Sequence, residues 1–100
     1  MALLELTLIP IGTETTSVSK YIAGAYNEVR DMEGFRIELT SMGSIIEGDI
    51  NIIMDVVRKM QESVFKNGAD RVYSVIKVDD RRDKDSNMDK KVESVKEKLE

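Results

Sequence analysis

The chain contains no cysteine and no histidine, and it has a single proline. The lack of cysteine excludes disulfides, thiol nucleophiles and zinc-finger sites, and the lack of histidine excludes a Ser-His-Asp triad. Its apolar runs are far shorter than the roughly 20 residues that a membrane-spanning helix needs. No basic segment followed by an apolar core opens the chain, so secretion is not indicated. We therefore expect a cytoplasmic protein with no membrane partner.

What the chain has is an ordinary globular composition. Its 100 residues suffice for one domain, and 41% apolar with 34% charged residues is typical of a soluble fold. Fifteen basic residues against nineteen acidic ones give a net charge of −4. Nucleic-acid-binding proteins usually carry a basic surplus gathered in patches, so this balance argues against a nucleic-acid partner.

The order of hydrophobic patterns predicts an α+β fold. The expected elements are a strand over residues 3–11, a helix from about residue 17, strands over 35–42 and 44–47, a helix over 50–66 and a strand over 71–79. This βαββαβ order is that of the ferredoxin-like two-layer sandwich. We expect one domain over residues 1–83, followed by a charged connector and an extra helix over 84–100. Because this architecture hosts many functions, function must come from side chains.

Periodicity predicts which side chains form the core. In the first strand, Leu4, Leu6 and Leu8 alternate with polar and mixed residues, so they should face the helices. The expected buried helical faces are Val18, Ile22, Ala25, Val29 and Met32 in the first helix, and Ile53, Val57, Met60 and Val64 in the second.

Helix-capping residues predict where the helices begin and end. Residues 13–17 supply hydroxyl N-caps for the first helix, Gly34 a left-handed C-cap for it, and Asp49 an N-cap for the second helix. We expect the second helix to end at Asn67 and Gly68.

A final helix is indicated by Met88, Val92, Val95 and Leu99, which form a narrow apolar strip. A short helix with so narrow a strip is marginal alone in water. We expect it to dock on its own sheet edge or on a neighbouring subunit.

Several polar and aromatic features leave alternatives open. The loop over residues 12–17 could receive an anion at a helix N-terminus, although plain capping is the simpler interpretation. Glu5, Glu38 and Glu47 could gather on the open sheet face as an acid–base pair or a cation site, or form salt bridges with Arg71 and Lys77. The first and third strands, expected at the sheet centre, carry no aromatic residue, which argues against RNA recognition by base stacking.

Large apolar side chains on the open face predict an interface. Met42 is expected at the hairpin tip, and Tyr73 and Tyr21 project from the fourth strand and the first helix. Each could pack on a flat ring, but covering by a neighbouring subunit is the simpler interpretation.

Three sequence segments together resemble the small single-domain thiamine-binding protein family, relatives of tandem proteins that bind thiamine or its hydroxymethylpyrimidine half. They are residues 10–12 with 17–23, the Met-Gly-Ser-Ile-Ile-Glu-Gly-Asp run over 42–49, and residues 71–72 with 76–81. The hairpin run is the most specific, and the resemblance extends over about residues 3–83.

This resemblance implies a ferredoxin-like subunit, homodimers and homotetramers formed through sheets, and a pyrimidine pocket near a subunit interface. We expect a non-catalytic protein with no metal and no cofactor beyond the bound thiamine or hydroxymethylpyrimidine. An aminopyrimidine suits carboxylates and hydroxyls beside an apolar wall. The expected ligand-binding residues are Thr7, Thr40, Ser44 and Glu47 as polar contacts, with Met42 and Tyr21 as walls.

Two other functions stay open at this point. One is a structural or regulatory homo-oligomeric module with no physiological small ligand. The other is an enzyme that uses paired carboxylates.

Overall fold

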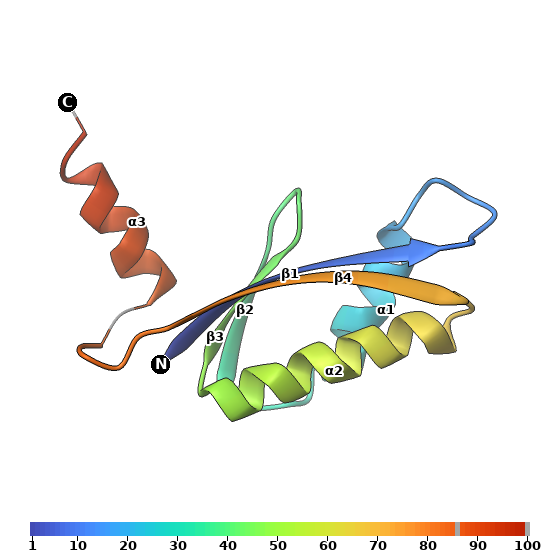
Figure 1. The fold of residues 1–100 in the computed structure, drawn as a ribbon, viewed down its shortest axis with the longest axis horizontal. Coiled ribbons are helices and arrows are strands. Elements are labelled where there is room, and N and C mark those ends of the chain that lie inside the picture. The colour runs from blue at the N-terminus through green and yellow to red at the C-terminus, as the bar shows by residue number, and fades with distance from the viewer. Residues whose placement is uncertain (86, 100) are drawn as a thin grey trace.

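The chain folds in the order that the sequence patterns predict. A computed structural model describes residues 1–85 and 87–99. The elements are β1 (Ala2–Ile11), α1 (Ser19–Val29), β2 (Phe35–Leu39), β3 (Ser44–Gly48), α2 (Ile50–Lys66), β4 (Arg71–Asp80) and α3 (Met88–Lys96). The four strands form one antiparallel sheet in the order β2-β3-β1-β4. Helices α1 and α2 lie on one side of it (Figure 1). The predicted ferredoxin-like α+β sandwich is confirmed.

The core lies between the sheet and the two helices, as the alternation in β1 predicts. Leu4, Leu6 and Leu8 are buried on the helix side of β1. The whole predicted face of α2 is buried as well, namely Ile53, Val57, Met60 and Val64. Asp49 caps α2, since its carboxylate accepts a hydrogen bond from Asn51 N at 3.0 Å. Asn67 and Gly68 end the helix as expected.

Strand β1 has a full partner on one side and half a partner on the other. It pairs with β4 along its whole length, from Ala2↔Asp80 to Ile11↔Arg71. Its pairing with β3 stops at Leu6↔Ser44. Beyond that point the β2–β3 hairpin leaves the sheet, and in Figure 1 its turn rises away from β1. We call the gap between residues 7–11 of β1 and the turn over residues 40–43 the split.

The boundaries of α1 and β2 differ from the prediction. Helix α1 begins at Ser19, and its N-cap, Val18, makes no side-chain capping bond. The hydroxyls of the preceding loop serve the loop itself: Thr13 Oγ1 donates to Thr15 O at 2.7 Å, and Ser17 N donates to Thr15 Oγ1 at 3.1 Å. Prediction of a hydroxyl N-cap was therefore wrong.

Two further boundaries were placed too late along the chain. Helix α1 ends at Val29, so Gly34 is not its C-cap but lies just before β2, with a φ of +90°. Strand β2 ends at Leu39 and not at residue 42, because Thr40 N donates to Gly43 O at 2.8 Å and closes the turn early.

Helix α3 lies on the side of the sheet opposite α1 and α2, where only its first turn contacts the strands (Figure 1). Met88 is buried there, whereas Val92, Val95 and Leu99 are exposed. Whether these three dock on another subunit stays a prediction. Across the described residues, none of the helices combines the length and apolarity required to cross a membrane.

Candidate functional site

The split opens into a cavity of about 200 Å³. Its apolar walls come from three elements: Leu6 and Leu8 of β1, Val18 and Ile22 at the start of α1, and Met60 of α2. The hairpin turn forms its rim. None of the residues that line it is charged. Drug-sized ligands occupy sites of roughly 300–1,000 Å³, so this cavity suits a single neutral ring.

The turn at the rim is held by two threonine hydroxyls. Thr7 Oγ1 donates to Met42 O at 3.2 Å, across the split. Thr40 Oγ1 donates to Gly43 O at 3.0 Å and accepts from Met42 N at 3.3 Å. Both hydroxyl protons are therefore engaged by backbone carbonyls, and what remains for a ligand is acceptor capacity.

Gly43 permits the close approach of the turn to β1. A Cβ at this position would lie 2.6 Å from Leu6 O and 3.0 Å from Thr7 Oγ1. A side chain there would push the turn away from the strand, so the shape of the cavity depends on this glycine.

A third hydroxyl lies deeper in the cavity. Ser44 is buried, and its Oγ is 2.7 Å from Tyr26 OH of α1. Either oxygen can be the donor, so the pair keeps one proton for a further partner. Sequence analysis did not select Tyr26. A signal existed, because Tyr26 follows Ile22 by four residues and so shares the helix face that turns toward the sheet.

The structure brings together four of the six predicted ligand-binding residues. Thr7, Thr40, Met42 and Ser44 all line the cavity. Tyr21 does not line it and instead packs, half-buried, against the core. Glu47 lies on the open face near the other end of β3, opposite Leu3 of β1.

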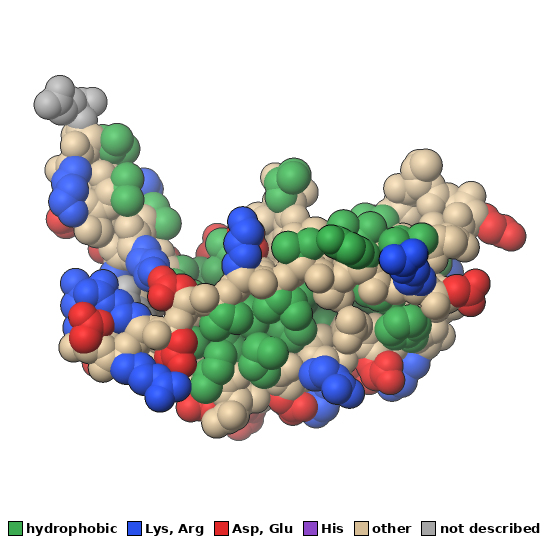
Figure 2. Space-filling model, in the orientation of Figure 1, with side chains coloured by type: hydrophobic (Ala, Val, Ile, Leu, Met, Phe, Trp, Pro, Cys, Tyr) green, Lys and Arg blue, Asp and Glu red, His purple; other side chains and the backbone are tan. Residues whose placement is uncertain are grey.

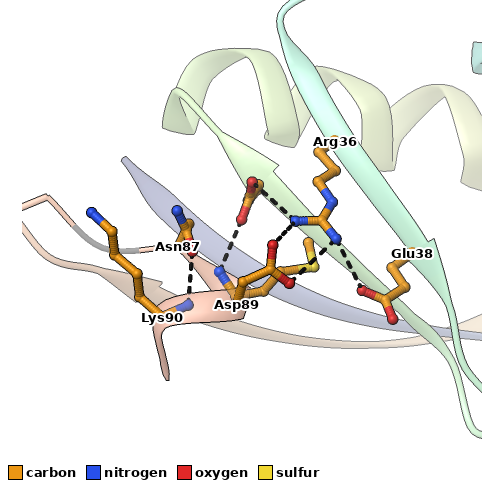
Figure 3. A network of polar contacts seen from close by, with 7 residues as sticks. Arg36, Glu38, Asn87, Asp89 and Lys90 are labelled. Carbon is orange, nitrogen blue, oxygen red and sulfur yellow. Dashed lines mark hydrogen bonds and ion pairs between the residues drawn. The ribbon is translucent and has the colours of Figure 1, made fainter. Parts of the chain in front are cut away.

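Glu47 belongs to a polar cluster that holds the first turn of α3 (Figure 3). Its Oε2 accepts from Met88 N at 3.0 Å, and its Oε1 lies 3.9 Å from Arg36 Nη1. The same guanidinium forms a 2.7 Å bond with Asp89 Oδ2 and lies 3.7 Å from Glu38. The hydrogen bond from Arg36 lowers the pKa of Asp89. A carboxylate so used is a structural anchor for the helix.

The three open-face carboxylates are each paired with a base. Lys77 Nζ lies 3.6 Å from Glu5, as predicted. Glu38 and Glu47 share Arg36, a residue that sequence analysis did not select. Arg71 lies opposite Ile11 at the far end of the sheet, so its predicted pairing with these glutamates was wrong. These ion pairs favour the salt-bridge interpretation over an acid–base pair.

Comparison with known proteins gives a consistent result. A sequence model described as thiamine-binding protein matches residues 4–96. A UPF0045 protein of Methanothermobacter thermautotrophicus is 45% identical over 95% of this chain and 96% of its own length. A second UPF0045 protein, YqgV of Bacillus subtilis, is 40% identical over 99% of this chain and 98% of its own. The crystal structure of a hypothetical protein from Methanocaldococcus jannaschii has a TM-score of 0.84, with 31% identity and 96% of each chain covered.

Proposed function

Because this chain belongs to the thiamine-binding protein family, we propose that it binds thiamine or a related hydroxymethylpyrimidine in the cavity at the split. The observation that carries this proposal is the chemistry of that cavity. Apolar walls of single-ring size meet the hydroxyls of Thr7, Thr40 and Ser44, and no charge is present. A neutral aminopyrimidine fits such a site better than a phosphate or a carboxylate does.

The position of the split also suits a ligand with two rings. The pyrimidine would lie against the apolar walls, and the second ring of thiamine would extend past the turn toward solvent. Met42 is 82% exposed at this rim, and its flexible thioether can pack against a ring that leaves the cavity. Binding without catalysis is the activity that we assign, in the cytoplasm and with no metal.

Calorimetric titration with thiamine and with hydroxymethylpyrimidine tests the proposal. Ser44→Ala removes a cavity hydroxyl and should weaken binding by about 1 kcal/mol, roughly a fivefold loss of affinity. Ser74→Ala is the matched control, because Ser74 also bears a hydroxyl with one side-chain partner, Gln61 Nε2 at 3.0 Å, but lies outside the cavity. Absence of binding by the unaltered protein to either compound would overturn the proposal.

A second function is favoured by a different surface. Ile9, Tyr73 and Val75 are exposed on the open sheet face, and Val92, Val95 and Leu99 are exposed on α3. Figure 2 shows apolar side chains along the sheet and along α3. An uncovered apolar face of this kind favours a homo-oligomeric structural or regulatory module. That function requires assembly without any ligand, so titration distinguishes it from the first.

A further inference from the structure

The main chain of Leu8 faces the split. A Cβ on Gly43 would lie 2.6 Å from Leu6 O, so the carbonyl of Leu6 points toward the hairpin. Main-chain groups of successive strand residues alternate between the two edges, so Leu8 directs its N–H and C=O to the same edge as Leu6. Pro10 agrees with this direction. It has no N–H, yet it lies within the β1–β4 pairing, as is tolerated where the nitrogen points away from the partner strand.

The residue that would pair with Leu8 is occupied elsewhere. Continuation of the β1–β3 register beyond Leu6↔Ser44 would place Met42 opposite Leu8. Instead Met42 O accepts from Thr7 Oγ1, and Met42 N donates to Thr40 Oγ1. Across the described residues, we find no protein group that takes over the N–H or the C=O of Leu8. Buried strand groups are nearly always paired, so a ligand in this cavity meets one free donor and one free acceptor.

We propose that Leu8 recognises the ring through its main chain, an inference that rests on the proposed function. Its N–H donates to a ring nitrogen, and its C=O accepts from the amine on the adjacent carbon. The aminopyrimidine edge thus completes the rung of the β1–β3 ladder that Met42 leaves open. A residue in a hydrogen-bonded antiparallel pair exchanges both of its bonds with one partner, and a ring edge with an acceptor beside a donor reproduces that partner.

Thr7 and Thr40 are positioning residues in this arrangement. Their hydroxyls satisfy Met42 so that it does not pair with Leu8, and they keep the split open. Ser44 remains available at the deep end for the other side of the ring.

Nuclear magnetic resonance of the ¹⁵N-labelled protein tests the role of Leu8. On addition of hydroxymethylpyrimidine, we expect the Leu8 amide proton to move downfield and to become protected from exchange. The Ile9 amide, which faces β4, is the control and should already be protected. If the compound binds and the Leu8 amide is unaffected, this inference is overturned while the proposed function stands. If the compound does not bind, the proposed function fails and this inference fails with it.

A ligand analogue tests the acceptor half of the arrangement. Replacement of the 4-amino group by a methyl group keeps the shape of the ring and removes the donor. The methyl analogue should bind about tenfold more weakly, because Leu8 C=O stays buried without a partner. Equal affinity for the two compounds would contradict the assignment of Leu8 C=O.

Variants of Thr40 test the positioning role. Thr40→Val removes the acceptor of Met42 N, whereas Thr40→Ser keeps it. In the valine variant we expect weaker ligand binding and a Leu8 amide that is protected even without ligand, because Met42 can then pair with it. The serine variant should behave as the unaltered protein does. A valine variant with an unprotected Leu8 amide and full affinity would overturn this role.

Discussion

Arg36 Nη1 lies 2.7 Å from Asp89 Oδ2, and this ion pair joins β2 to α3 across 53 positions of the sequence. Together with the bond from Met88 N to Glu47, it fixes the start of α3 on the open face of the sheet. The rest of the helix has no comparable anchor. Attachment of α3 therefore depends on charge at one end, and it should respond to pH.

Acid should release α3 before the sheet unfolds. The guanidinium of Arg36 lowers the pKa of Asp89 below its ordinary value of 3.8. A carboxyl with a lowered folded-state pKa stabilises the fold fully above its unfolded value, and this stabilisation is lost as the pH falls through the folded value. Amide exchange in α3 should therefore accelerate below about pH 4. Asp89→Asn should show fast exchange already at neutral pH, and a helix with the same protection at every pH would contradict this.

Substitution of Glu47 should affect α3 and leave ligand binding unchanged. Glu47→Leu leaves Met88 N without its acceptor, which should lower the free energy of unfolding by about 1–3 kcal/mol. Glu47→Gln keeps an acceptor oxygen and should cost less. Denaturant unfolding measures both effects. A tenfold loss of thiamine affinity in the glutamine variant would instead place Glu47 in the ligand site, as the sequence alone suggested.

A pair of lysine substitutions identifies the face used for self-association. We expect a homotetramer built from symmetric dimers, because Val75 and its neighbours on the open face are exposed. Val75→Lys should reduce the mass measured by light scattering. Ile76→Lys, at an adjacent and similarly exposed position on the opposite face, is the control and should not. An unaltered protein of 11.3 kDa at micromolar concentration would refute self-association.

Gly43→Ala should damage both the turn and the site. The new Cβ would lie 2.6 Å from a backbone oxygen that cannot move freely, and overpacking of this kind typically costs about 1–3 kcal/mol. We expect a lower melting temperature and weaker binding of hydroxymethylpyrimidine. Ser41→Ala in the same turn is exposed and should change stability little. Retained affinity in the alanine variant would show that the cavity tolerates a displaced turn.

Truncation after Asp83 tests the apolar strip of α3. Without the helix, Glu47 loses its partner Met88 and part of the open face is uncovered. We expect lower stability or a changed mass distribution. The same melting temperature and mass in the truncated chain would show that α3 supports neither fold nor assembly.

Local patterns predicted the fold because they act over short stretches of the chain. The alternation of Leu4, Leu6 and Leu8 and the stripe from Ile53 to Val64 each require one buried face, and the structure has both. Helix α1 was placed too early because the loop hydroxyls, Thr15 among them, bond within the loop, and periodicity carries no information on that choice.

The site was less predictable because its contacts join distant residues. Thr7 and Met42 meet only because β1 and the hairpin are neighbours in the sheet. The bond between Met88 and Glu47 depends on where the connector lets α3 fall, which no pattern within α3 specifies. The type of residue selected Glu47 as a ligand contact, and the fold uses it as a helix anchor.

Pro10 has a consequence for solubility. The split is a stretch of unpaired strand edge inside an otherwise complete sheet, and such edges recruit strands from other molecules and promote aggregation. A strand that paired with β1 there would need a donor at residue 10 as well as at Leu8, and proline provides none. The edge is therefore long enough for a single ring and too short for an intruding chain, so one residue without an N–H keeps the site open to small molecules while it protects the protein from itself.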